Sequence, residues 1–234
     1  MTQTHTALLA ALALALPLSA AAQEAEIRKN LAARLPALSQ IDEISKTPMP
    51  GLFEVRVGHD LLYTDAEGNF LIQGSLFDTR ERKNLTEERV EKLTAINFAD
   101  LPLKNAIKQV RGNGKRKLAV FEDPNCGYCK RFEKDLQNVD NVTVYTFLLP
   151  ILGTDSVEKT KHIWCAKDKL KAWNDWMLRD ATPKAANCNT DAITANLELA
   201  KKYRITGTPA LVFENGTRVP GAINAQQIES MLSR

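Results

Sequence analysis

Apolar residues recur every three or four positions over residues 26–38, a spacing that predicts an amphipathic helix. Short apolar runs separated by turn signals follow in residues 51–79 and predict a meander of about four short strands. This helix and meander would bury little surface alone, and an antiparallel edge strand invites pairing with a second copy. We therefore expect residues 23–83 to form a small α+β dimerisation domain.

A second helix is predicted after Asn84. Asn84 followed by Glu87 three positions later is typical of a helix N-terminus. Val90, Leu93 and Ile96 then form only a thin apolar stripe among charged residues, which indicates a mostly solvated helix. We interpret residues 84–100 as a linker helix between two domains.

Strands and helices alternate in the remaining part of the chain. Residues 97–117 are weakly patterned, and a tight turn at residues 112–114 closes them. The pattern then predicts strands, helices and a long helical stretch that together form an α/β domain over residues 101–234 with a helical insertion. The predicted strands are residues 117–121, 142–149 and 210–213, and the predicted helices are residues 126–137, most of 156–203, and a last helix capped by Asn224 with Gln227 three positions later.

The first 22 residues resemble a cleaved secretory signal. Residues 7–22 are apolar, contain Pro17, and end on the small residues Ala20, Ala21 and Ala22. A membrane span needs about 20 continuous apolar residues, which this run does not provide. No Lys or Arg precedes the run, so an uncleaved anchor or a lipoprotein is the alternative, although no Cys stands at the predicted cleavage site to carry a lipid. Export would place the chain in an oxidising compartment, where disulfides persist.

Composition narrows the function classes. Of the 234 residues, 44% are apolar and 25% are charged, which excludes a mostly disordered or multi-span chain. The net charge of +3 is too small to indicate nucleic acid as a partner. Four cysteines are too few to replace a hydrophobic core, so their positions carry the information.

Cys126 and Cys129 form a C-x-x-C motif between a predicted strand and a predicted helix. Unpaired N–H groups and the helix dipole at a helix N-terminus favour a thiolate, so we expect Cys126 to attack disulfides and Cys129 to resolve the product. Glu122 and Asp123 would oppose this thiolate if they lay close to it. The charged residues that follow on the helix are expected to form a solvated outer face: Lys130, Arg131, Glu133, Lys134 and Asp135.

A structural disulfide and half of a zinc site are the competing interpretations of this motif. Zinc requires a second pair of ligands. The other cysteines, Cys165 and Cys188, are 23 positions apart, and only His59 and His162 follow the predicted signal. We favour redox chemistry and predict no metal and no cofactor.

Thr208 and Pro209 directly precede the predicted strand at residues 210–213. A proline at the head of a strand lacks the N–H needed for pairing and is a candidate for a cis peptide, although a trans turn is the commoner state.

Taken together, the CGYC motif, the segment TGTPALVFENGTRVPG, the signal and the N-terminal stretch LLYTDAEGNFLIQGSLFDT resemble the periplasmic disulfide isomerases of the DsbC/DsbG family. The resemblance covers essentially the whole mature chain and implies a thioredoxin-like fold for residues 101–234. Gly127 stands where DsbG-like members typically carry Pro, which favours the DsbC type.

The resemblance also implies roles for individual residues. Cys126 would form the mixed disulfide and Cys129 would resolve it, with Gly127 and Tyr128 completing the motif. A cis Pro209 would lie beside them, and Thr208 would offer backbone groups to an extended substrate. Cys165 and Cys188 match a second, non-catalytic pair in the family's helical insertion, with free thiols or a second redox pair as the alternatives. The nearby Trp164, Trp173 and Trp176 are expected to pack in the core.

We therefore expect a homodimeric periplasmic isomerase that rearranges incorrect disulfides in exported proteins and is kept reduced by a membrane thiol reductant of the DsbD type. The alternatives are a DsbG-like reductase or chaperone and a dithiol oxidase of the same fold.

Overall fold

The computed structural model describes residues 19–234 and contains two compact units, whose boundary falls between Val90 and Glu91 inside helix α2 (Leu85–Thr94). Most of the predicted signal, residues 1–18, lies outside the described residues, so the signal stays a prediction. In the described part of the chain, no helix is both long enough and apolar enough to cross a membrane.

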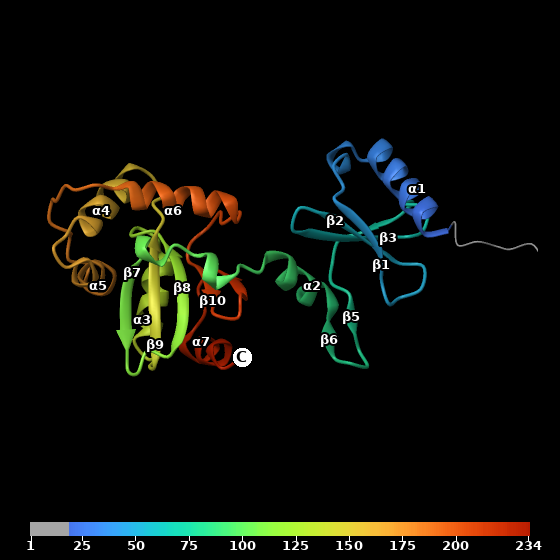
Figure 1. The fold of residues 1–234 in the computed structure, drawn as a ribbon. Coiled ribbons are helices and arrows are strands. Elements are labelled where there is room, and N and C mark those ends of the chain that lie inside the picture. The colour runs from blue at the N-terminus through green and yellow to red at the C-terminus, as the bar shows by residue number, and fades with distance from the viewer. Residues whose placement is uncertain (1–18) are drawn as a thin grey trace, which may run out of the picture. The chain divides into compact units, whose positions relative to one another are not determined.

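The N-terminal unit packs one helix against a four-stranded antiparallel meander (Figure 1). Ile27 and Leu31 are buried against Phe53 and Val55, so one stripe of the helix and one face of the sheet form this unit's core. The elements are α1 (Ser19–Arg34), a 3-10 turn (Pro36–Leu38), β1 (Glu43–Lys46), β2 (Phe53–Val57), β3 (Asp60–Thr64) and β4 (Leu71–Ile72), followed by the hairpin of β5 (Phe77–Asp78) and β6 (Lys83–Asn84).

Two boundaries in this unit differ from the prediction. The first helix begins at Ser19 and ends at Arg34 rather than spanning residues 26–38. Pro36 cannot continue the helix because it lacks an N–H, and it begins a 3-10 turn that leaves Leu35 exposed. Strand β1 precedes the predicted meander, and Phe77 pairs in the separate β5–β6 hairpin.

Helix α2 confirms the predicted cap and the predicted exposure. Asn84 Oδ1 accepts the Glu87 N–H at 3.1 Å, and no residue of the helix is buried. The helix ends at Thr94, however, and Ile96 is not part of its stripe. Ile96 is buried in the core of the C-terminal unit, where its N–H donates to the Gly216 carbonyl at 3.0 Å.

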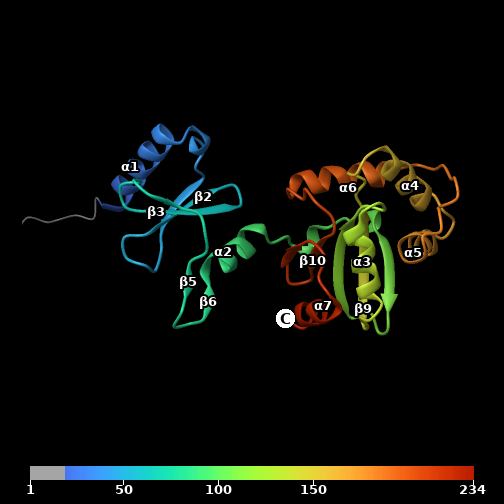
Figure 2. The same ribbon diagram turned by 180° about the vertical axis from the view of Figure 1, so that it is seen from behind.

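The C-terminal unit is built on a five-stranded sheet of order β11-β10-β8-β9-β7, in which only β8 and β9 run parallel. Alternate residues of β8 face opposite sides of the sheet. Leu118 and Val120 pack with α3 and α7, while Ala119 and Phe121 pack with α6 and the segment after α2 (Figures 1 and 2). The strands are β7 (Ile107–Arg111), β8 (Arg116–Glu122), β9 (Val142–Leu148), β10 (Ala210–Phe213) and β11 (Arg218–Pro220). The 3-10 turns are Phe98–Asp100 and Leu103–Asn105, and the helices are α3 (Gly127–Leu136), α4 (Thr154–Trp164), α5 (Lys169–Arg179), α6 (Asp191–Lys202) and α7 (Ala225–Leu232).

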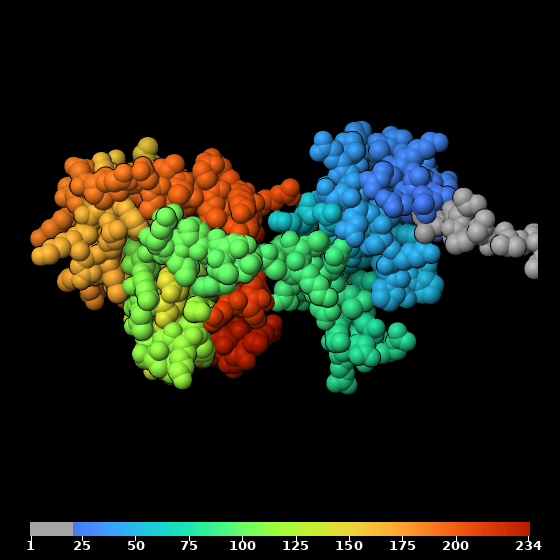
Figure 3. Space-filling view, viewed as in Figure 1, coloured from blue at the N-terminus to red at the C-terminus, as the bar shows by residue number. Residues whose placement is uncertain are grey.

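Helices α4 to α6 form the predicted insertion between β9 and β10, and Figure 3 shows them in gold to orange over one end and one side of this unit. Trp164 and Trp173 are buried in the cluster that also holds Cys126 and Cys129, and the partly buried Trp176 packs against that cluster. Residues 180–190 between α5 and α6 have no regular structure, and a disulfide between Cys165 and Cys188 ties them to the end of α4.

Strand β7 was not predicted, because it lies in the weakly patterned stretch of residues 97–117. Only Ile107 of its five residues is buried, and Val110 is exposed. Because β7 is an edge strand, its sequence lacks the apolar run that marks β8 and β9.

We predict that replacing Cys165 and Cys188 with Ser lowers the free energy of unfolding of the C-terminal unit by about 3 kcal/mol, because a loop of this length gains chain entropy when it is opened. The three tryptophans all lie in this unit, so their fluorescence during urea unfolding reports its stability. Both proteins should carry Cys126→Ser, so that no disulfide forms at the C-x-x-C motif. Equal midpoints would contradict the prediction.

Candidate thiol–disulfide exchange site

Cys126 lies between the end of strand β8 at Glu122 and the start of helix α3 at Gly127. It is the N-cap residue of α3, and its Sγ accepts the backbone N–H of Cys129 at 3.3 Å. Cys129 follows in the first turn. Both cysteines carry free thiols; Cys126 is 6% exposed and Cys129 is fully buried. The first sulfur is thus the only one of the two with access to solvent.

The surroundings of Cys126 lower its thiol pKa to about 6. The largest cause is the hydrogen bond from the Cys129 thiol to the Cys126 sulfur, and burial opposes it. The Thr208 side chain and the backbone N–H groups of Tyr128 and Cys129 add to the lowering. A thiolate therefore forms at Cys126 at neutral pH.

Cys129 is shifted in the opposite direction. Burial raises its pKa strongly, the hydrogen bond to Cys126 raises it further, and the charge of Glu122 adds to the same effect. The two sulfurs, three positions apart, thus differ in their readiness to ionise: the pKa of Cys126 is lowered, whereas that of Cys129 is raised.

The second loop of the site contains the cis peptide bond between Thr208 and Pro209, just before β10. The Thr208 carbonyl oxygen lies 3.2 Å from Cys126 Sγ, although the two residues are 82 positions apart. The Pro209 carbonyl accepts the N–H of Gly221 at 2.8 Å, which fixes the loop against the end of β11. The structure therefore brings together the predicted Cys126, Cys129, Thr208 and Pro209.

The prediction that Glu133 lies on a solvated face of α3 was wrong. Its side chain is buried, and Glu133 Oε1 accepts the indole N–H of Trp173 at 2.7 Å. Glu122, also buried, has no hydrogen-bond partner for either carboxylate oxygen among the described residues. Burial raises the pKa of both carboxyls, and the charge of Glu133 raises that of Glu122 further. A signal for Glu133 existed in the sequence, because it stands four positions after Cys129 and three before Leu136, on the buried stripe of the helix.

Asp123 does not act against the Cys126 thiolate as its position in the sequence suggested. Its carboxylate is buried and accepts hydrogen bonds from the backbone N–H groups of Asn125, Ile151 and Leu152 and from the Ser156 hydroxyl. These four donors compensate the charge locally.

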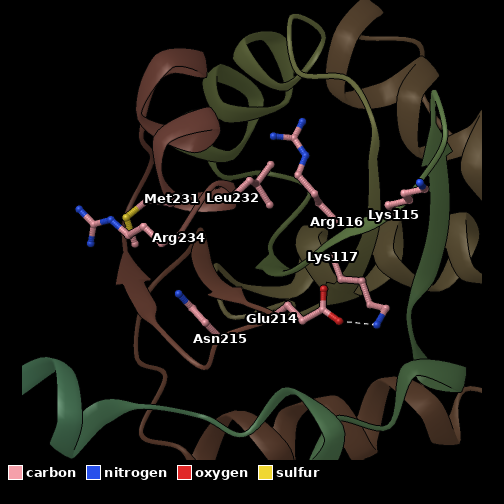
Figure 4. A pocket seen from close by; sticks show the side chains of 8 residues that line it. All are labelled: Lys115, Arg116, Lys117, Glu214, Asn215, Met231, Leu232 and Arg234. Atoms are coloured by element: carbon pink, nitrogen blue, oxygen red, sulfur yellow. Dashed lines mark hydrogen bonds and ion pairs between the residues drawn. The ribbon is translucent and has the colours of Figure 1, made fainter.

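A separate hollow of about 350 Å³ lies at the other end of β8 (Figure 4). An ion pair between Lys117 and Glu214 crosses it, and Arg116 at its wall pairs with Glu229 on α7. Because Arg116 begins β8 and Cys126 follows its end, this hollow is remote from the thiols. Among residues 19–234, no group of three His, Cys, Asp or Glu side chains is placed to hold a metal ion.

Comparisons with known proteins agree with this geometry. Residues 103–234 match a thioredoxin-like domain family, and residues 18–87 match the disulfide bond isomerase N-terminal domain family. A probable thiol:disulfide interchange protein DsbC of Bordetella pertussis is 47% identical over 192 residues, which cover 82% of this chain and 68% of the relative.

The chain belongs to the DsbC family of thiol:disulfide interchange proteins. The DsbC protein of Escherichia coli K12 is 30% identical over 194 residues, covering 81% of this chain and 80% of that relative. A crystal structure of a disulfide interchange protein from Neisseria gonorrhoeae superposes with a TM-score of 0.54 at 39% identity, covering 57% of this chain and 96% of that one. The C-terminal unit thus has the thioredoxin-like fold, and this DsbC-family chain is a thiol–disulfide oxidoreductase.

We predict that alkylation of the reduced protein by iodoacetamide follows a thiolate titration with a midpoint near pH 6, because the pKa of Cys126 is about 6. The rate should fall about tenfold for each pH unit well below that midpoint. Cys129→Ala removes the thiol that donates to Cys126 Sγ, so the midpoint should move upward. Cys126→Ser should abolish the fast reaction. A midpoint near the value of about 8.5 for a free cysteine would contradict the assignment.

Proposed function

We propose that this DsbC-family chain is a homodimeric periplasmic disulfide isomerase that rearranges incorrect disulfides in exported proteins through Cys126. The observation that carries the proposal is the asymmetry of the two thiols: the pKa of Cys126 is lowered to about 6, whereas Cys129 is buried and its pKa is raised.

The first step is attack of the Cys126 thiolate on a substrate disulfide. A bond forms between Cys126 Sγ and one substrate sulfur, and the other substrate sulfur leaves as a thiolate. That thiolate then attacks a different disulfide of the same substrate. When a substrate thiolate finally attacks the mixed disulfide, Cys126 leaves again as a thiolate, for which its low pKa suits it. No net oxidation or reduction occurs over this cycle.

In the alternative route, Cys129 resolves the mixed disulfide. Its thiolate attacks Cys126 Sγ, the substrate sulfur leaves, and a Cys126–Cys129 disulfide forms while the substrate is reduced. Because the pKa of Cys129 is raised, this exit is slow, and the substrate has time to rearrange. The oxidised pair then needs two electrons, which we assign to a membrane thiol reductant of the DsbD type.

Substrate contacts are proposed for the surface around Cys126. Tyr128 is 68% exposed next to the buried cysteines, and Gly127 leaves open space beside it. The Thr208 carbonyl lies 3.2 Å from the same sulfur, and we propose that Thr208 and the cis Pro209 hold an extended substrate segment. The Cys165–Cys188 disulfide, which we propose to be structural, supports folding in an oxidising compartment. A signal in residues 1–22 would direct the chain there.

Dimerisation is proposed to use the N-terminal unit, residues 23–83, with residues 84–100 as the linker to the catalytic domain at 101–234. Strand β4 of this unit is a short edge strand, and its two apolar side chains are exposed together with neighbouring aromatic residues. An exposed apolar edge of this kind is a template for pairing with a second copy. The exposed residues are Phe70, Leu71, Ile72 and Phe77.

We predict that the pre-reduced mature chain reactivates scrambled ribonuclease A in a glutathione buffer, and that Cys126→Ser loses this activity completely. Cys129→Ser should retain part of it, because the isomerisation cycle itself does not require the resolving thiol. Full activity in Cys126→Ser would refute the proposal. Failure of the wild type, with Cys126 and Cys129 still cycling between dithiol and disulfide, would indicate a dithiol oxidase or dedicated reductant.

We predict that Ile72→Lys converts the dimer into a monomer in sedimentation equilibrium, because a charge on an apolar pairing edge opposes association. Val110→Lys is the matched control, since Val110 is an equally exposed apolar residue on an edge strand of the other unit. A wild-type chain that sediments as a monomer would contradict the proposed assembly.

A further inference from the structure

Trp176 lies at the point where the helical insertion meets the loop that carries Cys126. Its indole N–H donates to the Pro124 carbonyl at 2.6 Å, although the two residues are 52 positions apart. Trp176 belongs to α5, and it packs against the buried cluster that contains both thiols. The indole therefore joins the insertion to the backbone two residues before Cys126.

The Pro124 carbonyl depends on this donor. Pro124 is buried and precedes α3, whose first backbone hydrogen bond runs from the Lys130 N–H to the Cys126 carbonyl. The helix therefore supplies no N–H to the Pro124 carbonyl, and within residues 19–234 the Trp176 indole is its only hydrogen-bond donor. Because a buried carbonyl without a partner is costly, this bond favours one position of the loop.

Two lysines fix the indole in turn. The ammonium groups of Lys130 on α3 and Lys159 on α4 lie 4.0 Å and 4.8 Å from the centre of the Trp176 ring. Each ammonium is itself paired with a carboxylate, Lys130 with Asp180 and Lys159 with Asp155. A cation is attracted to the face of an aromatic ring, so α3 and α4 both hold the ring that α5 carries.

The residues on either side of Pro124 are held as well. The Asn125 side-chain amide donates to the Asp155 carboxylate at 2.6 Å, and the Asn125 N–H donates to the Asp123 carboxylate at 2.7 Å. The Cys126 N–H donates to the Asp123 carbonyl at 3.1 Å. The loop thus enters α3 in a fixed conformation, with Cys126 as the N-cap residue.

We propose that Trp176 is a positioning residue of the thiol–disulfide exchange reaction. It holds the Pro124 carbonyl so that Cys126 Sγ stays within reach of the hydrogen-bond donors at the N-terminus of α3. Those hydrogen bonds weaken steeply when the sulfur moves, because they depend on distance and angle. This role needs only the exchange chemistry of the family, so it does not depend on whether the chain acts as an isomerase.

A variant that changes no charge separates position from electrostatics. Trp176→Phe keeps an aromatic ring beside both lysines and deletes the indole N–H. A shift in the acidity of Cys126 in this variant therefore reports a displaced sulfur. The charged groups around the loop are the same in the variant and in the wild type: Lys130, Lys159, Asp155, Asp180 and the buried Glu122.

The test measures alkylation of the pre-reduced mature chain by iodoacetamide against pH, and its equilibrium with glutathione. In that equilibrium the Cys126–Cys129 disulfide takes two electrons from two glutathione thiols, which become glutathione disulfide. We expect Trp176→Phe to raise the alkylation midpoint by about half a pH unit, which is part of the free energy of one hydrogen bond. The equilibrium should shift about threefold toward the protein disulfide, because the reduced form loses stabilisation of its thiolate.

Trp164→Phe is the matched control. Trp164 lies in the same buried cluster and also has a lysine beside its ring, with the Lys169 ammonium 3.3 Å from the ring centre. In the described part of the chain, however, no hydrogen bond joins Trp164 to the cysteine loop. This variant should keep the wild-type midpoint and the wild-type equilibrium with glutathione.

Asn125→Ala displaces the same loop without touching the insertion. It removes the hydrogen bond to Asp155, changes no charge, and should raise the alkylation midpoint in the same direction. Circular dichroism shows whether each variant is folded, and urea unfolding measures its stability. If Trp176→Phe does not fold, an unchanged midpoint in Asn125→Ala overturns the proposal.

A merely structural role of Trp176 has a different signature. It would lower the urea midpoint of Trp176→Phe and leave its alkylation midpoint and glutathione equilibrium unchanged, and this result would overturn the proposal. An equal rise of the alkylation midpoint in Trp164→Phe would also overturn it, because packing of the insertion rather than the indole N–H would then set the acidity of Cys126.

Discussion

The hydrogen bonds received by Cys126 Sγ at the N-terminus of α3 are the interaction on which the site depends. They come from the Cys129 thiol and from backbone N–H groups of the first helical turn, and they favour a negative charge on one sulfur while the other is buried. This arrangement requires β8 to end at Glu122 and α3 to begin at Gly127, so that Cys126 is the cap itself. Moving either boundary by one residue would take the sulfur away from these donors.

The helical insertion holds this junction in place. Trp173 on α5 donates to Glu133 behind Cys129, and Trp176 on the same helix donates to the Pro124 carbonyl at 2.6 Å in the cysteine loop. The Lys130 ammonium lies 4.0 Å from the centre of the Trp176 ring. Helix α4 contributes Ser156, whose hydroxyl donates to the Asp123 carboxylate beneath the cysteine loop. The insertion is therefore a support of the active-site loop as well as a cover for the sheet.

Local patterns were sufficient to predict most elements of the fold. The caps at Asn84 and Asn224 and the apolar runs of β8 and β9 are short-range signals, and each reappears in the structure. Elements whose stability comes from distant partners were missed. Edge strand β7 is defined by its pairing with β9, and Ile96 is buried by contacts with residues far along the chain. Of the site, the motif indicated which thiol has the lowered pKa, but the closeness of Thr208 to Cys126 was expected only from the family resemblance.

The helical spacing of Glu133 carried a signal for its burial, but its hydrogen bond from Trp173 was beyond sequence prediction, because the two residues are 40 positions apart. The burial of Glu133 also affects the pKa values of the groups around Cys129. Burial raises the pKa of Glu122, the neighbouring Glu133 raises it further, and any negative charge on Glu122 disfavours a second one on Cys129. In the cycle that we propose, the Cys129 thiol loses its acceptor when Cys126 is bonded to a substrate, but burial and Glu122 still raise its pKa. Release by reduction would then stay slow while release by the substrate's own thiols is unaffected, and this difference would favour rearrangement over reduction.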